Sequence, residues 1–187
     1  MARVRLIRRA TRYRGRIIQL VQEVLEVRGR RIVRETVRHP GAAVIVPMLD
    51  RSHIVFVRQY RRAVGRYLLE LPAGTLAPGE RPSVCAQREL EEEVGYRAKR
   101  LTKLGQFYAA PGFASERMVV FLAEDLRPVK AHPEPDELLT PVVLSFKEAQ
   151  RKIRSGAICD AKTIIGLSWA ARILRKASCR LRDARKK

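Results

Sequence analysis

Over the first 75 residues, hydrophobic positions either alternate with polar ones or form short unbroken runs, which predicts strands. RIIQLVQEVLEV (16–27) is rich in β-branched residues, RGR follows as a turn, and RIVRETVR (31–38) resumes the alternation, so we expect a β-hairpin. GAAVIVPML (41–49) and IVFVRQY (54–60) are nearly continuous apolar runs, typical of buried strands of a central sheet. YLLELPAG adds a short strand that ends at Gly74.

Residues 82–95 change to helical spacing, with Pro82 and Ser83 as first-turn and capping signals and Gly95 as a stop. Strand-like segments follow near 101–108, 117–123 and 139–146, and helices are predicted at about 147–155 and 161–177. The segment RPVKAHPEPDE (127–137) holds three prolines and several acids, so we expect a surface loop. This order of elements predicts an α/β (α+β) fold.

The length of 187 residues fits one domain, but the charge is unusual for such a domain. There are 39 Lys and Arg against 19 Asp and Glu, and the bases gather in residues 3–38 and 172–187. A polyanionic partner is one interpretation, and solvated arginines without a specific role are the other. No apolar run approaches the roughly 20 residues of a membrane helix, so no membrane partner is expected. The spacing of Cys85, Cys159 and Cys179 suits neither disulfides nor zinc, which favours a reducing cytoplasm.

An acidic cluster stands out within the helical segment 82–95. On a helical wheel Glu89, Glu92 and Glu93 fall within an arc of about 100°, beside an apolar stripe of Ala86, Leu90 and Val94. Like charges at this spacing repel each other. One reading is a solvated acidic face relieved by a link from Arg88 to Glu92. The other is a magnesium site, because hard cations bind clustered carboxylates.

The spacing of this segment resembles the Nudix box. The box has the pattern G-x5-E-x7-R-E-U-x-E-E-x-G-U, where U is bulky and apolar. This chain matches it with Gly74, five residues, Glu80, seven residues, Arg88-Glu89-Leu90, one residue, Glu92-Glu93, one residue, Gly95 and Tyr96. Tyr96 in the last apolar slot is the one departure. The resemblance implies a Nudix fold: a mixed central β-sheet sandwiched by helices, with an N-terminal β-hairpin.

The same resemblance implies hydrolysis of a diphosphate linked to another moiety, with Mg2+ as the cofactor and Mn2+ as a substitute. Carried over to this chain, the metal ligands are Glu89, Glu93, Glu92 and the backbone carbonyl of Ala73. Arg88 and Glu80 are implied to orient these carboxylates.

The flanking segments are similar to the ADP-ribose pyrophosphatase branch of the family. They are ELPAG before the box and FYAAPGFASE after it, with HPGAAVIVPM and VRQYR upstream and SGAICDAKTIIGL downstream. Pro111 lies fifteen residues beyond the box, the spacing associated with that branch. The similarity covers roughly residues 13–170. It implies cleavage of ADP-ribose to AMP and ribose 5-phosphate, with other nucleoside diphosphate sugars or dinucleotides as the alternative.

The resemblance also implies which side chains bind the substrate. Arg61 is expected to contact the diphosphate and Arg34 to stack on adenine, although each arginine can equally be a surface charge. Arg16 stands where relatives present an aromatic side chain, and a guanidinium can also stack on a base. The remaining implied contacts are Glu70 of ELPAG, Glu116, and the turn that contains Ala110 and Gly112.

A general base is implied in the loop 127–137, where Glu137 matches best and Glu134 and Asp136 are alternatives. The resemblance further implies a homodimer in which residues 1–38 bind the partner chain and the base of the substrate. Residues 39–177 then form the hydrolase domain and 178–187 a basic tail. A hypothesis from another class is an RNA-binding or RNA-processing protein, motivated by the charge of +20. It is disfavoured because aromatic residues make up only 6% of the chain and no nucleic-acid-binding motif is recognisable.

Overall fold

The computed structural model describes residues 3–132 and 138–184, with side chains up to residue 174. The chain divides into two compact units. Unit 1 consists of Met1–Gly41 and Phe107–Met118, and unit 2 of Ala42–Gln106 and Val119–Lys187. In the described residues no helix is long and apolar enough to cross a membrane.

Unit 1 is built on a three-stranded antiparallel sheet in the order β1-β2-β3, formed by β1 (Val4–Arg14), β2 (Gln19–Val27) and β3 (Arg30–Arg38). The predicted hairpin is confirmed as β2 and β3. Its two loop residues, Arg28 and Gly29, both have positive φ, as the tight turn between twisted strands requires. The arginine-rich β1 was not predicted as a strand. Arg5 and Arg9 pair with glutamates of β2, which allows a basic segment to join the sheet.

Unit 2 contains most of two sheets. One has the order β7-β4-β9-β8 and the other the order β10-β5-β6. The strands are β4 (Ala42–Pro47), β5 (His53–Arg61), β6 (Arg66–Glu70), β7 (Ala73–Thr75), β8 (Tyr96–Tyr108), β9 (Arg117–Pro128) and β10 (Leu139–Ser145). Residues 41–49 and 54–60 do contain buried strands, as predicted, but these strands lie in two different sheets and not in one central sheet. The turn after β4 passes the chain to the second sheet, and an isolated bridge pairs Met48, which follows β4, with Ile54 of β5.

Three helices complete unit 2: α1 (Pro82–Val94), α2 (Phe146–Arg154) and α3 (Ala161–Ala184). The predicted helix 82–95 is confirmed as α1, and Gly95 ends it in the left-handed conformation. The N-cap of α1 is Arg81, which makes no side-chain cap, so Ser83 does not have the predicted capping role. The later helices are also confirmed, and α3 continues beyond the predicted end at residue 177.

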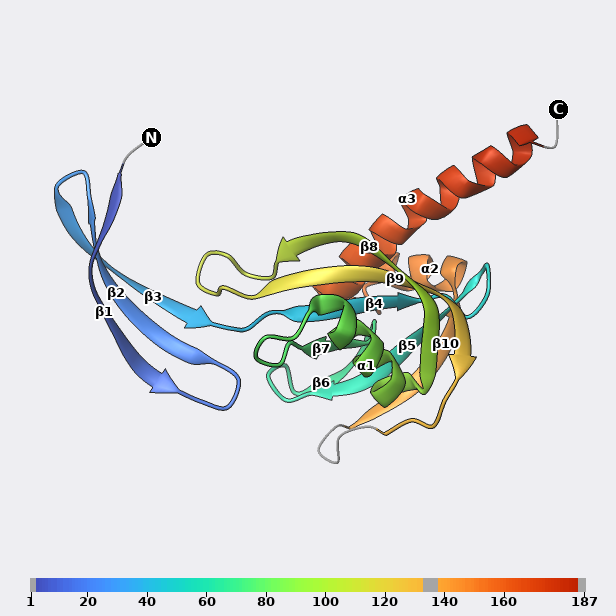
Figure 1. The fold of residues 1–187 in the computed structure, drawn as a ribbon, viewed down its shortest axis with the longest axis horizontal. Coiled ribbons are helices and arrows are strands. Elements are labelled where there is room, and N and C mark those ends of the chain that lie inside the picture. Colours follow the sequence, from blue (N-terminus) through green and yellow to red (C-terminus); the bar gives the residue numbers. More distant parts are fainter. Residues whose placement is uncertain (1–2, 133–137, 185–187) are drawn as a thin grey trace. The chain divides into compact units, whose positions relative to one another are not determined.

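Strand β4 lies at the centre of unit 2 because both of its faces are covered (Figure 1). Ala43 and Ile45 belong to a core cluster with Ala86 and Leu90 of α1. The opposite face meets α3, where a Cβ on Gly166 would lie 3.4 Å from the Val46 side chain. The apolar stripe predicted for α1 is therefore buried, and its acidic arc lies at the margin of this core.

Candidate metal and diphosphate site

The acidic arc of α1 rests on strand β7, and Gly74 makes this approach possible. A Cβ built on Gly74 would lie 1.8 Å from both Cδ and Oε1 of Glu89. Only the absence of a side chain leaves room for the Glu89 carboxylate, which is 7% exposed. The first glycine of the box and the Glu89 carboxylate are thus linked by packing.

Arg88 organises the acidic side chains around it. Its Nη1 donates hydrogen bonds to Glu89 Oε1 at 2.6 Å and to Glu92 Oε2 at 2.8 Å. Its Nε and Nη2 donate to the two oxygens of Glu80 at 3.1 and 3.2 Å. The hydrogen bonds that Arg88 donates to Glu80 are the largest of the effects that raise the pKa of Arg88, and they also lower the pKa of Glu80. The predicted link from Arg88 to Glu92 is confirmed, and Glu80 and Arg88 are brought together with the carboxylates of the box.

Glu93 lies on the inner side of the arc and is 2% exposed. Its Oε2 accepts a hydrogen bond from the backbone amide of Ala73 at 3.2 Å, so this carboxylate also reaches β7. Cys85, one helical turn before Glu89, is fully buried. Burial and then the charges of Glu89 and Glu80 raise the pKa of its thiol to about 12, which keeps it neutral. The inner face of α1 therefore has two buried carboxylates above the strand Ala73–Thr75.

These residues fit a divalent cation by donor type. Glu80, Glu89, Glu92 and Glu93 carry four negative charges and Arg88 carries one positive charge, so the cluster has an excess of three negative charges. Hard cations prefer such oxygen ligands. Among the described side chains, those of residues 3–132 and 138–174, no three of His, Cys, Asp or Glu already stand in a metal-binding arrangement. Arg88 instead draws three of the carboxylates, those of Glu80, Glu89 and Glu92, toward itself.

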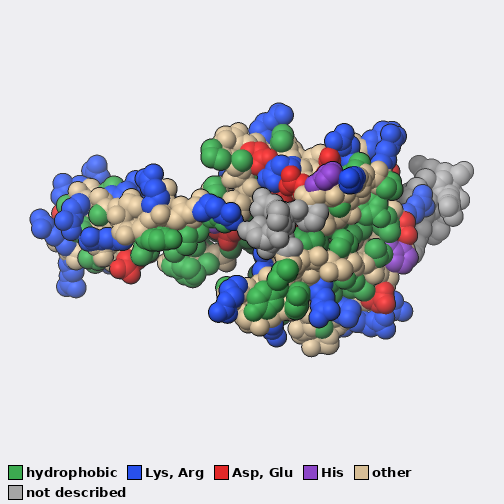
Figure 2. Space-filling view, turned by 90° about the horizontal axis from the view of Figure 1, so that it is seen from below, with side chains coloured by type: hydrophobic (Ala, Val, Ile, Leu, Met, Phe, Trp, Pro, Cys, Tyr) green, Lys and Arg blue, Asp and Glu red, His purple; other side chains and the backbone are tan. Residues whose placement is uncertain are grey.

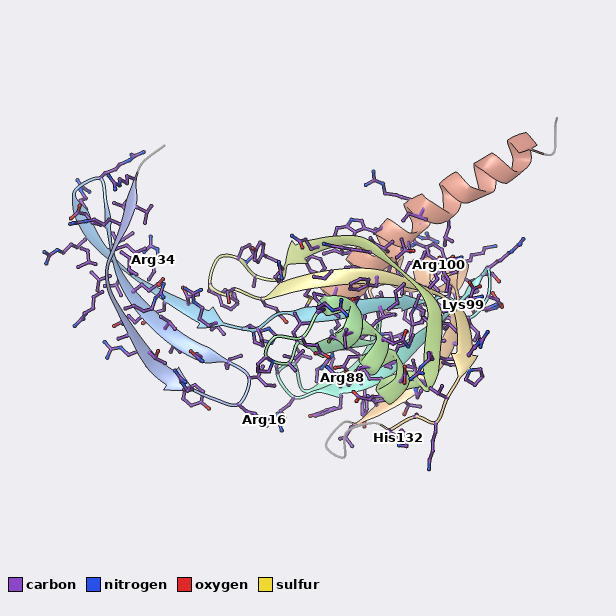
Figure 3. All side chains as sticks on the ribbon, viewed as in Figure 1. Arg16, Arg34, Arg88, Lys99, Arg100 and His132 are labelled. Atoms are coloured by element: carbon purple, nitrogen blue, oxygen red, sulfur yellow. The ribbon has the colours of Figure 1, made fainter. Side chains whose placement is uncertain are left out.

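A groove of about 660 Å³ runs along the outer side of α1 and includes Arg88 and Glu92 in its lining. Lys99, Lys130 and His132 also line this groove, and Figure 3 labels Arg88, Lys99 and His132. Solvent therefore reaches the Arg88–Glu92 pair from this side, whereas Glu89 and Glu93 face the protein interior.

Arg61 at the end of β5 belongs to a second polar group of unit 2. Its Nε and Nη2 donate to the two oxygens of Glu70 at 2.9 and 2.6 Å. Burial opposes the charge of Arg61, but the hydrogen bonds and charge of Glu70, and then the charge of Glu93, raise its pKa. Arg61 thus lies within electrostatic reach of the inner carboxylate of α1. Glu70, predicted to bind substrate, is only 1% exposed and contacts protein groups in this structure.

The second partner of Glu70 is Lys162, a residue that the sequence analysis missed. Its ammonium group forms an ion pair with Glu70 Oε2 and another, at 3.1 Å, with Asp160 Oδ1. The sequence carried one signal for this arrangement. Asp160 and Thr163 have the spacing of a helix cap, and Asp160 Oδ2 does accept from the Thr163 amide at 3.0 Å. A cap at Asp160 puts Lys162 in the first turn of α3.

Five of the predicted substrate contacts lie in unit 1. Arg16 follows β1 and Arg34 lies on β3 (Figure 3). Arg34 is exposed, and its Nη1 donates to the carbonyl of Val33. Ala110 and Gly112 form the turn that precedes Glu116, in which the Ala110 carbonyl accepts from the Ala114 amide at 2.8 Å. Glu116 Oε1 lies 3.7 Å from His39 Nδ1.

The candidate general bases Glu137, Glu134 and Asp136 lie outside the described residues. Their proposed role therefore stays a prediction from the sequence.

Known proteins share both the sequence and the fold of this chain. A family model described as NUDIX domain matches residues 38–164. The ADP-ribose pyrophosphatase of Bacillus subtilis (strain 168) is 39% identical over 160 residues, which cover 84% of this chain and 86% of the relative. The ADP-ribose pyrophosphatase of Mycobacterium tuberculosis is 41% identical over 162 residues, covering 84% and 78%. A solved structure titled "Crystal structure of ADP compounds hydrolase" superposes with a TM-score of 0.83 at 27% identity, covering 93% of this chain and 95% of that one.

These matches and the geometry of α1 define an α+β protein in which two box carboxylates, Glu89 and Glu93, lie against β7. The chain belongs to the Nudix family and has the Nudix fold. The predictions of family and fold class are confirmed.

Proposed function

We propose that this protein hydrolyses the diphosphate bond of ADP-ribose to AMP and ribose 5-phosphate. The observation that carries the proposal is the convergence of Glu89 and Glu93 on β7, where Gly74 makes room for one carboxylate and the Ala73 amide binds the other. Relatives named ADP-ribose pyrophosphatase, at 39% and 41% identity, support the choice of substrate.

We further propose Mg2+ as the cofactor, with Mn2+ as a substitute. Glu89, Glu93, Glu92 and the Ala73 carbonyl would hold the metal. When bound, the ion neutralises the diphosphate and lowers the pKa of an attacking water. Arg88 Nη1 binds both Glu89 and Glu92, so these two carboxylates are held beside one another before the metal arrives.

The chain's own side chains account for the remaining parts of the proposed reaction. Arg61 is suited to bind a diphosphate because Glu70 takes its Nε and Nη2, so that Nη1 can donate a charge-assisted hydrogen bond to a phosphate oxygen. Glu137, with Glu134 and Asp136 as alternatives, would accept the proton of the attacking water. We propose that Glu116, Ala110 and Gly112 contact the ribose. Arg34 and Arg16 would contact the adenine.

We also propose that the protein forms a homodimer through the sheet of unit 1. Leu6, Leu25 and Ile32 pair across β1, β2 and β3 and so form an apolar row on one face of that sheet. Val4 and Leu6 are 59% and 47% exposed, and no helix of the described residues belongs to unit 1. A three-stranded sheet needs a packed face for stability. Figure 2 shows basic side chains spread over this sheet beside a gathering of hydrophobic ones.

The proposed activity is tested by incubating the protein with ADP-ribose and Mg2+ and separating the nucleotides. We expect AMP to appear. Glu93→Gln should lower kcat by roughly two or more orders of magnitude, because it removes a group that the reaction needs. Glu91→Gln is the matched control, because Glu91 lies on the same helix but pairs with Arg97. Absence of AMP with every divalent cation would reject the proposal.

Nucleoside diphosphate sugars are the second candidate substrates. A GDP-mannose pyrophosphatase of Cronobacter sakazakii is 32% identical over 164 residues, covering 83% of this chain and 80% of the relative. Comparing kcat/KM for ADP-ribose, ADP-glucose and GDP-mannose distinguishes ADP-ribose from the other nucleoside diphosphate sugars as the preferred substrate. A higher value for GDP-mannose would reassign the substrate without changing the site.

A further inference from the structure

A buried chain of polar contacts in unit 2 connects the first turn of α3 to Arg61. We propose that Lys162 is a positioning residue for substrate binding, which acts through Glu70 on Arg61. This inference rests on the proposed function, because it takes Arg61 as a contact of the diphosphate. Lys162 itself lies outside the family box.

The burial and contacts of the three side chains suit an indirect role. The Lys162 side chain is 8% exposed, so it has little access to a substrate, whereas Arg61 is 37% exposed. Glu70 lies between them and is bound from both sides. Glu70 occupies Nε and Nη2 of Arg61, and Nη1 has no hydrogen-bond partner among the residues that the structure describes. The guanidinium is thus fixed along one edge while Nη1 is left for a ligand.

The charges explain why a second cation is needed behind Glu70. Arg61 and Glu70 alone cancel, and Asp160 adds a negative charge to the same group. Glu93 is also within electrostatic reach of Arg61. Without Lys162 the group of Arg61, Glu70 and Asp160 would carry a net charge of −1, which opposes the binding of an anionic diphosphate. Lys162 brings this net charge to zero.

Hydrogen bonds hold Lys162 in this position from the α3 side. The Thr163 hydroxyl donates to Asp160 Oδ2 at 2.6 Å and accepts from the Leu71 amide at 2.8 Å. Leu71 follows Glu70 directly and precedes β7 by two positions. The start of α3 is therefore bonded to the same segment that carries Glu70 and leads to Ala73.

The test replaces Lys162 with methionine, which keeps the length and the apolar stem but removes the charge. We expect KM for ADP-ribose to rise about tenfold while kcat changes less than about threefold, because binding rather than chemistry depends on Arg61. Lys162→Arg should restore KM to within about threefold of the wild-type value. Lys147→Met, an exposed lysine of α2, is the matched control and should leave both constants unchanged. If Lys162→Met does not fold, Lys162→Gln replaces it, since glutamine keeps a hydrogen-bond donor and lacks the charge.

A double-mutant cycle with Arg61→Gln separates a positioning role from a merely structural one. If Lys162 acts through Arg61, its replacement should change KM much less in the Arg61→Gln background than in the wild type. Equal factors in both backgrounds, or equal losses in kcat and kcat/KM, would overturn the inference.

The same double-mutant cycle can be measured without turnover, as equilibrium binding of inorganic pyrophosphate in metal-free buffer. If the wild type fails to hydrolyse ADP-ribose yet shows the same non-additive loss of pyrophosphate binding, the proposed function fails and the role of Lys162 stands. If the wild type binds no pyrophosphate, or if Lys162→Met binds it as the wild type does, the role of Lys162 is refuted whatever the activity.

Discussion

Gly74→Ala is the most direct perturbation of the candidate metal site, because it adds one methyl group where the Glu89 carboxylate rests. The backbone of Gly74 lies outside the left-handed region, so alanine fits its conformation and only the overlap with Glu89 matters. The new Cβ would lie 1.8 Å from Glu89 Cδ and Oε1, where real Cβ atoms keep at least 3.0 Å. The carboxylate must therefore move by more than about 1 Å, the difference between these distances.

The expected effects on stability and on activity differ in size. Moving Glu89 breaks its 2.6 Å hydrogen bond with Arg88, and a charge-assisted hydrogen bond contributes roughly 1.5–3 kcal/mol to the free energy of unfolding. For a chain of this size, a loss of about 2 kcal/mol lowers Tm by roughly 4–8 °C. A misplacement of about 1 Å at a reacting centre costs about a hundredfold in rate. Gly74→Ala should thus fold and have little activity.

The assay measures Mg2+-dependent release of AMP from ADP-ribose together with a thermal melt. Gly156→Ala is the control, since φ of Gly156 is +76° with no atom nearby, and a side chain in that conformation costs about 1–2 kcal/mol. Both variants should lose similar stability, and only Gly74→Ala should lose activity. A Gly74→Ala protein with wild-type kcat and metal dependence would refute the idea that Glu89 must lie against β7.

Two further predictions concern charge and assembly. The hydrogen bond from Arg88 lowers the pKa of Glu80. The contribution of this ion pair to the free energy of unfolding is therefore complete above the ordinary glutamate pKa of 4.5, and it is lost as pH falls through the lowered pKa. Glu80→Gln should reduce the free energy of unfolding by about 1 kcal/mol at pH 7. In urea titrations the difference between variant and wild type should shrink toward pH 3. A difference that does not change with pH would contradict this. For the homodimer, light scattering should give twice the 21.3 kDa of one chain, and Leu6→Glu should give the single mass. A monomeric wild type would exclude the dimer.

The sequence predicted the parts of this fold whose structure depends on near neighbours. The spacing of Ala86, Leu90 and Val94 predicted both the helix and its buried face, because residues three and four apart lie together on any helix. The link from Arg88 to Glu92 followed from the same rule. Strand pairing could not be read in this way. β4 is apolar throughout and β5 contains the apolar run 54–57, and nothing in either run distinguishes one sheet from two.

The two arginines beside the acidic arc show the same limit in the site itself. Arg88 belongs to the helix that it neutralises, so its partners within that helix were fixed by spacing. Arg61 lies within electrostatic reach of Glu93 and is held there by its hydrogen bonds to Glu70. Glu70 in turn binds Lys162, which is ninety-two residues away in sequence. A charge that depends on such distant contacts has no local pattern. The acidic helix is a recognisable motif, but the cations that set its balance of charge become visible only after the chain has folded.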